Sequence, residues 1–209
     1  MPKTTILSTT DPRCLPLARQ VLKNHGIIAF PTDTIYGLAA DAFDPLAIER
    51  IFNVKQRPEN KALPVLIGTL KQLPRLALTV SENVEKLATA FWPGPLTIVL
   101  PKNSDLPEEL SPYPTIGIRM PNLAFTLELL VQTGPLATTS ANLSGGANPV
   151  SSQDVLDQLD GKIDLLLDGG STPGPIASTV IDATKPQISI LRQGSILMED
   201  LKVVLGSST

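Results

Sequence analysis

Three cationic side chains, Lys55, Arg57 and Lys61, lie within seven positions in the segment VKQRPENKALPVLI. Pro58 stands between them, and because proline ends a helix it predicts a loop at this point. Charge-assisted hydrogen bonds to phosphate are about twice as strong as bonds between neutral groups. Three converging cations could therefore hold a triphosphate, whereas cations at a solvated helix end would do no chemistry. The spacing leaves both interpretations open.

Two clusters of small polar residues follow apolar runs. PTDTIYGLAADA, at residues 31–42, surrounds Asp33 with threonines and continues to Gly37. Pro31, Asp33 and Gly37 also suit an ordinary turn, so a ligand contact and a turn explain this cluster equally well. TTSANLSGG, at residues 138–146, ends a strand-like run with hydroxyls, an amide and glycines. Such a loop suits a carboxylate or a phosphate, although a plain polar loop has the same composition.

Arg119 lies inside the apolar segment TIGIRMP. An arginine in a buried strand normally needs an anionic partner. Alternation along the strand puts Thr115, Gly117 and Arg119 on one face, where they would line a cavity. Arg192, in ILRQG, raises the same question. A further segment, STVID, begins with the hydroxyls of Ser178 and Thr179.

Several common sites are excluded by the residues that the chain lacks. The sequence contains neither of the two commonest phosphate loops, G-x-x-x-x-G-K-[ST] and G-x-G-x-x-G. His25 is the only histidine and Cys14 the only cysteine. A Ser-His-Asp triad would depend on His25, which stands at an expected helix end, and one cysteine with one histidine makes no usual zinc site.

The elements that must position these residues follow from periodicity and capping signals. Helices are expected at residues 11–25, 45–56, 81–91, 123–133, 151–159 and 198–205. Strands are expected at 26–32, 63–68, 96–101, 115–121 and 135–141, and in IDLLLDGG, STVIDA and QISILRQG. This gives roughly seven or eight strands with about five helices interspersed, and the last strands come in a run. The pattern predicts an α/β fold with a sheet of mixed direction, in one domain over 1–209 whose residues 195–209 form a helical tail.

Composition limits the classes of partner. The 209 residues carry a net charge of −3, which argues against the broad basic field that nucleic-acid binding needs. No stretch approaches the ~20 apolar residues of a membrane helix. The first residues show no signal-peptide core, and a single cysteine fits a reducing compartment. We therefore expect a cytoplasmic protein without a membrane partner.

Seven segments, in order, resemble the TsaC/YrdC family of threonylcarbamoyl-AMP synthases. They are FPTDTIYGLAADA, KQRPENKALPVLI, WPGPLTIVLP, TIGIRMP, TTSANLSG, STVID and LRQG. The resemblance covers about residues 15–195 and implies a twisted, mixed α/β sheet with a large concave cavity. The longer members carry an extra C-terminal domain. Since this chain ends about fifteen residues after LRQG, it resembles the short form.

The resemblance implies a reaction in which L-threonine, bicarbonate and ATP give threonylcarbamoyl-AMP and pyrophosphate. Other proteins would then transfer the threonylcarbamoyl group to an adenosine of tRNA. Mg²⁺ would be held mainly through the ATP phosphates, so the chain itself needs no acidic metal cluster. Some members bind RNA, and any binding of tRNA by this acidic chain is expected to be weak.

The resemblance also implies roles for individual residues. Catalytic positions are Lys55, Arg57 and Lys61. ATP-binding positions are Lys55, Arg57, Thr115, Ser140, Asn142, Asn148 and Arg192, with Ser140 and Asn142 beside the phosphates and metal. Threonine-binding positions are Thr32, Lys61, Arg119, Thr138, Ser178 and Thr179, with Arg119 on the carboxylate.

Three other functions compete with this interpretation. One is an RNA-binding relative without synthase activity, which the acidic composition disfavours. Another is a carbamoyl-transfer domain like that of hydrogenase-maturation proteins, which normally sits in a longer chain with zinc-finger cysteines. The last is a YciO-like paralogue, and such paralogues depart from the K-x-R-x-x-x-K pattern that is intact here.

Overall fold

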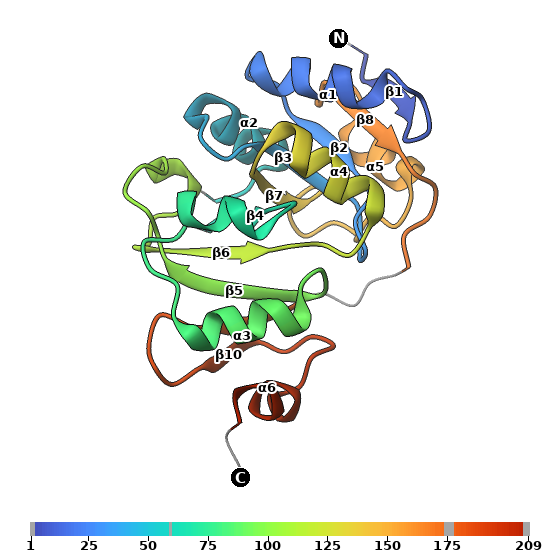
Figure 1. The fold of residues 1–209 in the computed structure, drawn as a ribbon. Coiled ribbons are helices and arrows are strands. Elements are labelled where there is room, and N and C mark those ends of the chain that lie inside the picture. Colours follow the sequence, from blue (N-terminus) through green and yellow to red (C-terminus); the bar gives the residue numbers. More distant parts are fainter. Residues whose placement is uncertain (1–2, 59, 174–177, 207–209) are drawn as a thin grey trace.

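Ten β-strands pair into one sheet of mixed direction in the computed structural model (Figure 1), which describes residues 3–58, 60–173 and 178–206. The strand order is β1-β8-β2-β3-β7-β4-β6-β5-β9-β10. The strands are β1 (Thr5–Ser8), β2 (Ile28–Phe30), β3 (Gly37–Asp41), β4 (Val65–Leu66), β5 (Leu96–Pro101), β6 (Thr115–Arg119), β7 (Leu136–Ser140), β8 (Leu165–Asp168), β9 (Thr179–Asp182) and β10 (Ser189–Arg192). The sheet contains parallel pairs, such as β5 with β9, and antiparallel pairs, such as β5 with β6, which confirms the predicted mixed sheet.

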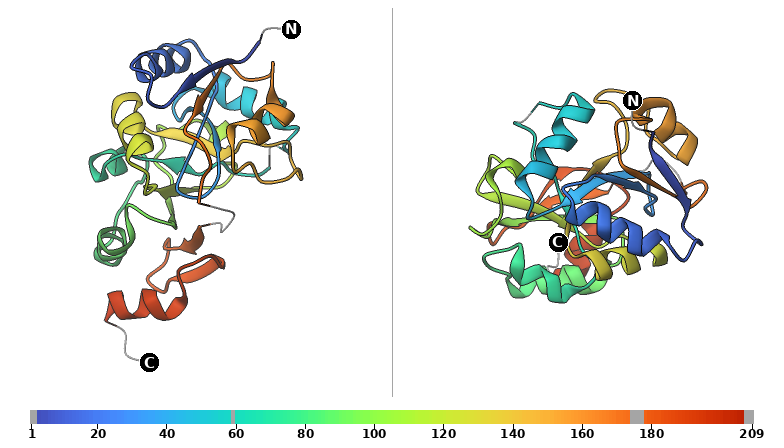
Figure 2. Two further views of the ribbon diagram at one scale, coloured as in Figure 1. Left: turned by 90° about the vertical axis from the view of Figure 1, so that its right-hand side faces the viewer. Right: turned by 90° about the horizontal axis from the view of Figure 1, so that it is seen from above.

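Helices cover both faces of this sheet (Figures 1 and 2). They are α1 (Cys14–Lys23), α2 (Pro45–Lys55), α3 (Glu82–Phe91), α4 (Ala124–Thr133), α5 (Ser152–Leu159) and α6 (Met198–Leu205), with short 3-10 turns η1 (Leu70–Arg75) and η2 (Glu108–Leu110). No helix in the described ranges is long and apolar enough to cross a membrane.

The core forms two apolar clusters, one on each face. Strand β2 shows how the pleat divides them: Ile28 and Phe30 pack with α1 and α4, whereas Ala29 packs with the larger cluster on the opposite face. Since both faces of the strand are covered, its residues are apolar without alternation.

Helix starts follow the sequence signals. Asp44 caps α2 by accepting hydrogen bonds from the backbone of Leu46 and Ala47, and Pro45 occupies the first turn. Ser151 and Asp154 form the capping box of α5. The six predicted helices are therefore confirmed, five of them to within a residue at each end, whereas α1 begins three residues later than predicted and ends two residues earlier.

Two strands were missing from the predicted set. The edge strand β1 is short and largely exposed, so it lacks an apolar pattern. The sequence of β3, GLAAD, follows a polar loop and consists of small residues, which carry little strand signal. The predicted strand at 63–68 is reduced to Val65–Leu66. The predicted C-terminal tail contains α6, which packs against α3, while residues 207–209 lie outside the described residues.

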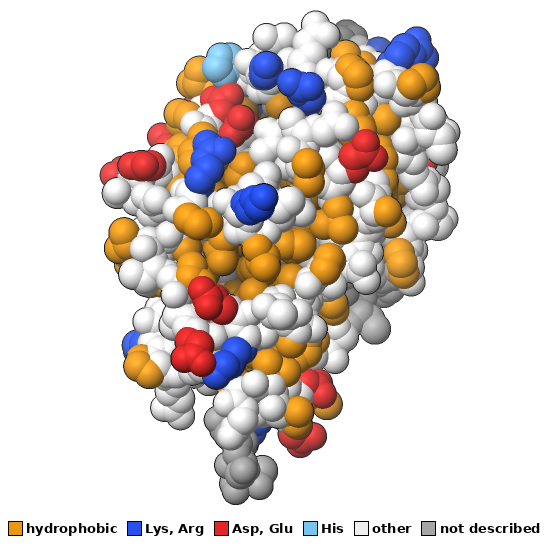
Figure 3. Space-filling model, in the orientation of Figure 1, with side chains coloured by type: hydrophobic (Ala, Val, Ile, Leu, Met, Phe, Trp, Pro, Cys, Tyr) orange, Lys and Arg blue, Asp and Glu red, His pale blue; other side chains and the backbone are white. Residues whose placement is uncertain are grey.

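Charged side chains are scattered over the face shown in Figure 3, where cations and anions alternate with apolar side chains. No continuous basic field appears on this face. The distribution agrees with the net charge of −3.

Candidate functional site

A cavity of about 520 Å³ lies against the middle and late strands of the sheet. Its wall is formed by the loop before β3, the ends of β3 and β7, and one face of β5, β6, β9 and β10. The lining residues are Thr32, Thr34, Ile35, Tyr36, Gly37, Arg57, Ala62, Pro64, Leu66, Thr97, Val99, Gly117, Arg119, Thr138, Thr139, Ser140, Asn148, Ser178, Val180 and Arg192. This volume is in the range of sites for small organic ligands.

Most of the residues predicted from the sequence meet in this cavity, but some do not. Eight of the thirteen line it: Thr32, Arg57, Arg119, Thr138, Ser140, Asn148, Ser178 and Arg192. Five do not: Lys55, Lys61, Thr115, Asn142 and Thr179.

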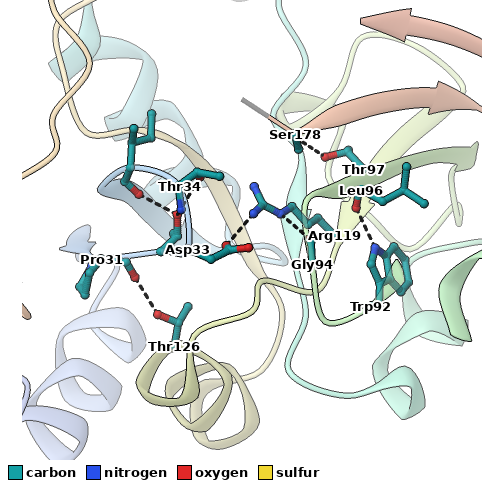
Figure 4. Close-up of polar contacts among 12 residues, drawn as sticks. Pro31, Asp33, Thr34, Trp92, Gly94, Leu96, Thr97, Arg119, Thr126 and Ser178 are labelled. Carbon is teal, nitrogen blue, oxygen red and sulfur yellow. Dashed lines mark hydrogen bonds and ion pairs between the residues drawn. The ribbon is translucent and has the colours of Figure 1, made fainter. Parts of the chain in front are cut away.

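Arg119 is anchored on one wall and only 7% exposed. Its Nε donates to the Gly94 carbonyl at 3.0 Å, and its Nη2 donates to Asp33 Oδ1 at 2.6 Å (Figure 4). The expected anionic partner of this buried arginine is therefore Asp33. Gly117 lines the cavity beside Arg119, as strand alternation predicted. A Cβ at Gly117 would lie 3.2 Å from Thr97 Cγ2, so the glycine keeps this space open.

Two further arginines reach the same cavity. Arg57 donates to the Ala62 carbonyl at 3.1 Å, and its Nε is buried without a partner among the described residues. Arg192 donates to the carbonyl and the hydroxyl of Ser178, and Ser178 Oγ lies 2.9 Å from Thr97 Oγ1. Burial lowers the pKa of Arg57, and burial together with the charge of Arg119 lowers that of Arg192.

The lining therefore combines three guanidinium groups with many hydroxyls and, among the described residues, no carboxylate. One part of the wall is apolar and is formed by Pro64, Leu66, Val99 and Val180. Such a cavity suits an anion that carries an organic body.

Lys55 does not line the cavity, although the sequence predicted that it would bind the ATP phosphates. Its side chain is 2% exposed, and its ammonium donates to Ser140 O at 2.5 Å, to Asn142 Oδ1 at 3.1 Å and to the Asn142 carbonyl. Burial, and to a lesser degree the charge of Arg57, lowers the pKa of Lys55 to about 8. The ammonium joins the end of α2 to the segment that follows β7, so Lys55 supports the cavity wall from behind.

The expected convergence of Lys55, Arg57 and Lys61 on one ligand is thus not what the structure shows. Only Arg57 faces the cavity. Lys61 is exposed on the loop after α2. Helix α2 ends at Lys55 and Gln56 adopts a left-handed backbone, so Arg57 and Lys61 belong to the loop that follows the helix.

Other predicted residues stabilise the backbone around the cavity. The Thr179 hydroxyl is fully buried, donates to Ile196 O at 2.9 Å and accepts from the amides of Gly194 and Ile196. Asn142 Oδ1 accepts from Ser140 Oγ at 2.6 Å as well as from Lys55. Thr115 stands at the start of β6, at the opposite end of the strand from Arg119.

Thr32 lines the cavity, but its hydroxyl is engaged in a turn. Thr32 Oγ1 donates to the Ile35 carbonyl at 2.7 Å and accepts from the Thr34 amide at 3.1 Å. The sequence cluster at 31–42 is therefore both a turn and a part of the cavity wall.

Sequence reasoning missed three residues that shape the site. Asp33 belonged to a recognised cluster but was assigned no partner. Gly94 lies in the segment WPGP. Its backbone carbonyl accepts the hydrogen bond from Arg119 Nε, a contact that involves no side chain of Gly94. Thr97 and Val99 lie two positions apart in the strand LTIVLP and share one face, so the alternation that identified Gly117 could also have placed Thr97 on the cavity face.

No group of three or more His, Cys, Asp or Glu side chains that could hold a metal ion occurs in the part of the chain that the structure describes. Asn142 Oδ1, which was expected beside the metal, already faces the ammonium of Lys55. This donor set does not fit a metal held by protein side chains.

The comparisons with known proteins agree on one family. Its model, named Sua5/YciO/YrdC and described as "Telomere recombination", matches residues 20–194. The chain is 40% identical over 192 residues to a threonylcarbamoyl-AMP synthase of Pyrococcus abyssi, and the match covers 91% of this chain and 56% of the relative. The chain is also 37% identical over 203 residues to a threonylcarbamoyl-AMP synthase of Bacillus subtilis. This match covers 96% of this chain and 58% of the relative. The chain thus spans somewhat more than half the length of these curated relatives.

Solved structures show the same fold. Sua5 from P. abyssi, complexed with L-threonine, superposes with a TM-score of 0.88 at 39% identity, over 92% of this chain and 57% of the other. YciO from E. coli superposes with a TM-score of 0.83 at 27% identity, over 96% of this chain and all of the other. The family model spans the strands and loops that build the cavity, and the chain belongs to the Sua5/YciO/YrdC family.

Proposed function

We propose that the protein is an L-threonylcarbamoyladenylate synthase, which makes threonylcarbamoyl-AMP and pyrophosphate from L-threonine, bicarbonate and ATP. The observation that carries this proposal is a single cavity in which three arginines, many hydroxyls and an apolar strip face one another. The names of the relatives and the L-threonine bound to a related Sua5 support the same choice of substrates.

The two substrates would occupy different parts of the cavity. Arg119 would bind the threonine carboxylate, with Thr138 and Ser178 as hydroxyl partners nearby. Arg57 and Arg192 would face the phosphates, and Ser140 and Asn148 lie at the β7 end of the same wall. The apolar strip that contains Val99 and Val180 would receive the less polar part of the nucleotide.

The reaction requires charge stabilisation and exclusion of water more than a strong base. The amine of threonine and bicarbonate would give a carbamate and release water, and the carbamate would then attack the α-phosphorus of ATP while pyrophosphate leaves. Negative charge on the phosphate oxygens would be stabilised by guanidinium groups that are already in place. Because the carbamate is labile, the part of the cavity that holds it would have to exclude water.

Mg²⁺ would enter with the nucleotide, because the side-chain donors described above do not form a metal site of their own. The product would pass to other proteins that transfer the threonylcarbamoyl group to tRNA, and direct binding of tRNA is expected to be weak.

The test is pyrophosphate release by the purified chain in the presence of ATP, Mg²⁺, bicarbonate and L-threonine. Release should require both threonine and bicarbonate, and omission of either should abolish it. Equal turnover of ATP without threonine would contradict the proposal. Release that depends on both substrates would also separate this chain from an RNA-binding or YciO-like paralogue without synthase activity.

A further inference from the structure

Asp33 is the carboxylate that contacts the cavity arginines in the described part of the chain. Its Oδ1 lies 2.6 Å from Arg119 Nη2, and the two side chains are 13% and 9% exposed. Neither Arg57 nor Arg192 has a carboxylate partner among the described residues. Since burying an ion pair carries a desolvation cost, a pair beside a cavity that must bind an anion calls for an explanation.

The position of Asp33 is fixed on both sides along the chain. The preceding Pro31 carbonyl accepts a 2.6 Å hydrogen bond from Thr126 Oγ1 on α4 (Figure 4). The following turn is closed by the Thr32 hydroxyl, which bonds to the backbone of Thr34 and Ile35. Asp33 therefore projects toward Arg119 from a braced turn.

The second anchor of Arg119 is equally well fixed. The Gly94 amide donates to the Met120 carbonyl at 2.8 Å, next to Arg119 in sequence, and the Gly94 carbonyl accepts from Arg119 Nε. A Cβ at Gly94 would lie 2.4 Å from the Phe91 carbonyl oxygen, so only glycine fits here without a shift. Two rigid segments, far apart in sequence, thus hold one guanidinium.

These two anchors leave a defined part of the guanidinium available. They use Nε and one hydrogen of Nη2, and no described residue bonds to Nη1. In the described part of the chain, the only buried side-chain nitrogen or oxygen without a partner is Arg57 Nε, so Nη1 remains accessible. Because Arg119 lines the cavity, the outer edge formed by Nη1 and Nη2 can offer two parallel hydrogen bonds to a carboxylate there.

We propose that Asp33 is a positioning residue, which together with the Gly94 carbonyl orients the Arg119 guanidinium so that its outer edge receives the carboxylate of the amino-acid substrate. The inference rests on the proposed function and assigns a role to the acidic residue of the PTDT turn. A competing role is direct contact between Asp33 and the substrate's ammonium group. The two roles predict different coupling between Asp33 and Arg119.

The first experiment compares Asp33→Asn with the wild type in pyrophosphate release. Loss of the charged anchor should raise the KM for L-threonine roughly 10-fold or more, as expected for one charge-assisted hydrogen bond, and change the KM for ATP far less. Asp33→Glu keeps the carboxylate and should retain most of the affinity for threonine. An unchanged threonine KM in Asp33→Asn, or a Glu variant as impaired as the Asn variant, would overturn the inference.

The matched control is Asp164→Asn, which removes the ion pair of Asp164 with Arg50 outside the cavity. It should leave both KM values near those of the wild type. Thermal unfolding of each variant shows whether the fold is kept, and calorimetric titration with L-threonine measures affinity without turnover.

The deciding experiment is a double-mutant cycle with Arg119→Met. If Asp33 acts through Arg119, adding Asp33→Asn to Arg119→Met should change kcat/KM for threonine less than about twofold. A loss of the same factor in both backgrounds would mean that Asp33 contacts the substrate directly and would overturn the positioning role. Failure of the wild type to release pyrophosphate in response to threonine would instead remove the proposed function, and this inference with it.

Discussion

At the scale of single residues, the burial of Lys55 gives this lysine a role in stabilising the fold. From the sequence, Lys55 could be one of three exposed cations. Replacing an exposed cation should change the stability of the fold very little. In the structure, three oxygens of Ser140 and Asn142 surround its ammonium, and 2% of the residue is exposed. Lys55 is therefore not an exposed cation, and its contacts join α2 to β7 and the segment after it.

Replacing Lys55 with methionine should destabilise the protein by about 1–3 kcal/mol, because the buried oxygens of Ser140 and Asn142 lose their hydrogen-bond donor. Urea denaturation followed by circular dichroism measures the change. Lys61→Met is the matched control, since Lys61 is exposed and its replacement should stay within about 0.5 kcal/mol of the wild type. Equal stabilities of the two variants would contradict the buried contacts.

The pKa of Lys55 leads to a pH-dependent stability. Burial lowers this pKa from 10.5 to about 8, so between these values the unfolded chain binds more protons than the folded chain. The stability contributed by the group is complete above pH 10.5 and is lost as the pH falls through about 8. The difference in unfolding free energy between the wild type and Lys55→Met should therefore grow from pH 7 to pH 10. A difference that is independent of pH would contradict this.

Arg119→Lys tests the division of the cavity between the two substrates. Lysine keeps the charge but loses the planar fork, which serves Gly94 and Asp33 and still leaves an edge for the substrate. The KM for threonine should rise more than the KM for ATP. The reverse order would move Arg119 to the phosphate side of the cavity.

At the scale of elements, β5 and β6 form one wall of the cavity, and the shape of this wall depends on small residues. Gly117 lies near the side chains of Thr97 and Pro64. A Cβ at this position would be 3.2 Å from Thr97 Cγ2 and 3.6 Å from Pro64 Cβ. Valine suits a strand, so the backbone would accept it, but its methyl groups would enter the cavity.

Gly117→Val should therefore fold nearly as well as the wild type and lose at least about 10-fold in kcat/KM, since the substrates must share a smaller space. Thermal unfolding and pyrophosphate release give the two readouts. Ser189→Val, at an exposed position of the edge strand β10, is the control for adding a β-branched residue to the sheet. Wild-type turnover by Gly117→Val would show that substrates do not use this wall.

The elements were largely predictable because their signals are local. Capping by Asp44, Ser81 and Ser151 and alternation along TIGIRMP depend on residues a few positions apart. The position of Lys55 depends on the contact of α2 with residues 85 and 87 positions away, which no local pattern contains. Asp33, the partner of Arg119, lies 86 positions away in the sequence, so no local pattern could have identified this contact either.

For the whole molecule, ligand binding should appear as thermal stabilisation. A ligand at 100 times its Kd stabilises the folded state by about 2.7 kcal/mol, which for a domain of this size is roughly 5–10 °C in Tm. L-threonine with a non-hydrolysable ATP analogue should give such a shift, and Arg119→Met should lose the part due to threonine. An equal threonine shift in both proteins would mean that threonine binds away from Arg119.

The strand order has a consequence for the protein during its synthesis. Strand β8 (Leu165–Asp168) lies between β1 and β2, so β1 has no partner strand, and β2 has only β3, until residue 168 has been made. At ribosomal rates of about 5–20 residues per second, β1 waits roughly 8–30 seconds after its own synthesis. During that interval one edge of the apolar strand β2 stays unpaired on the nascent chain. That edge is therefore open to pairing with other chains until β8 has been made.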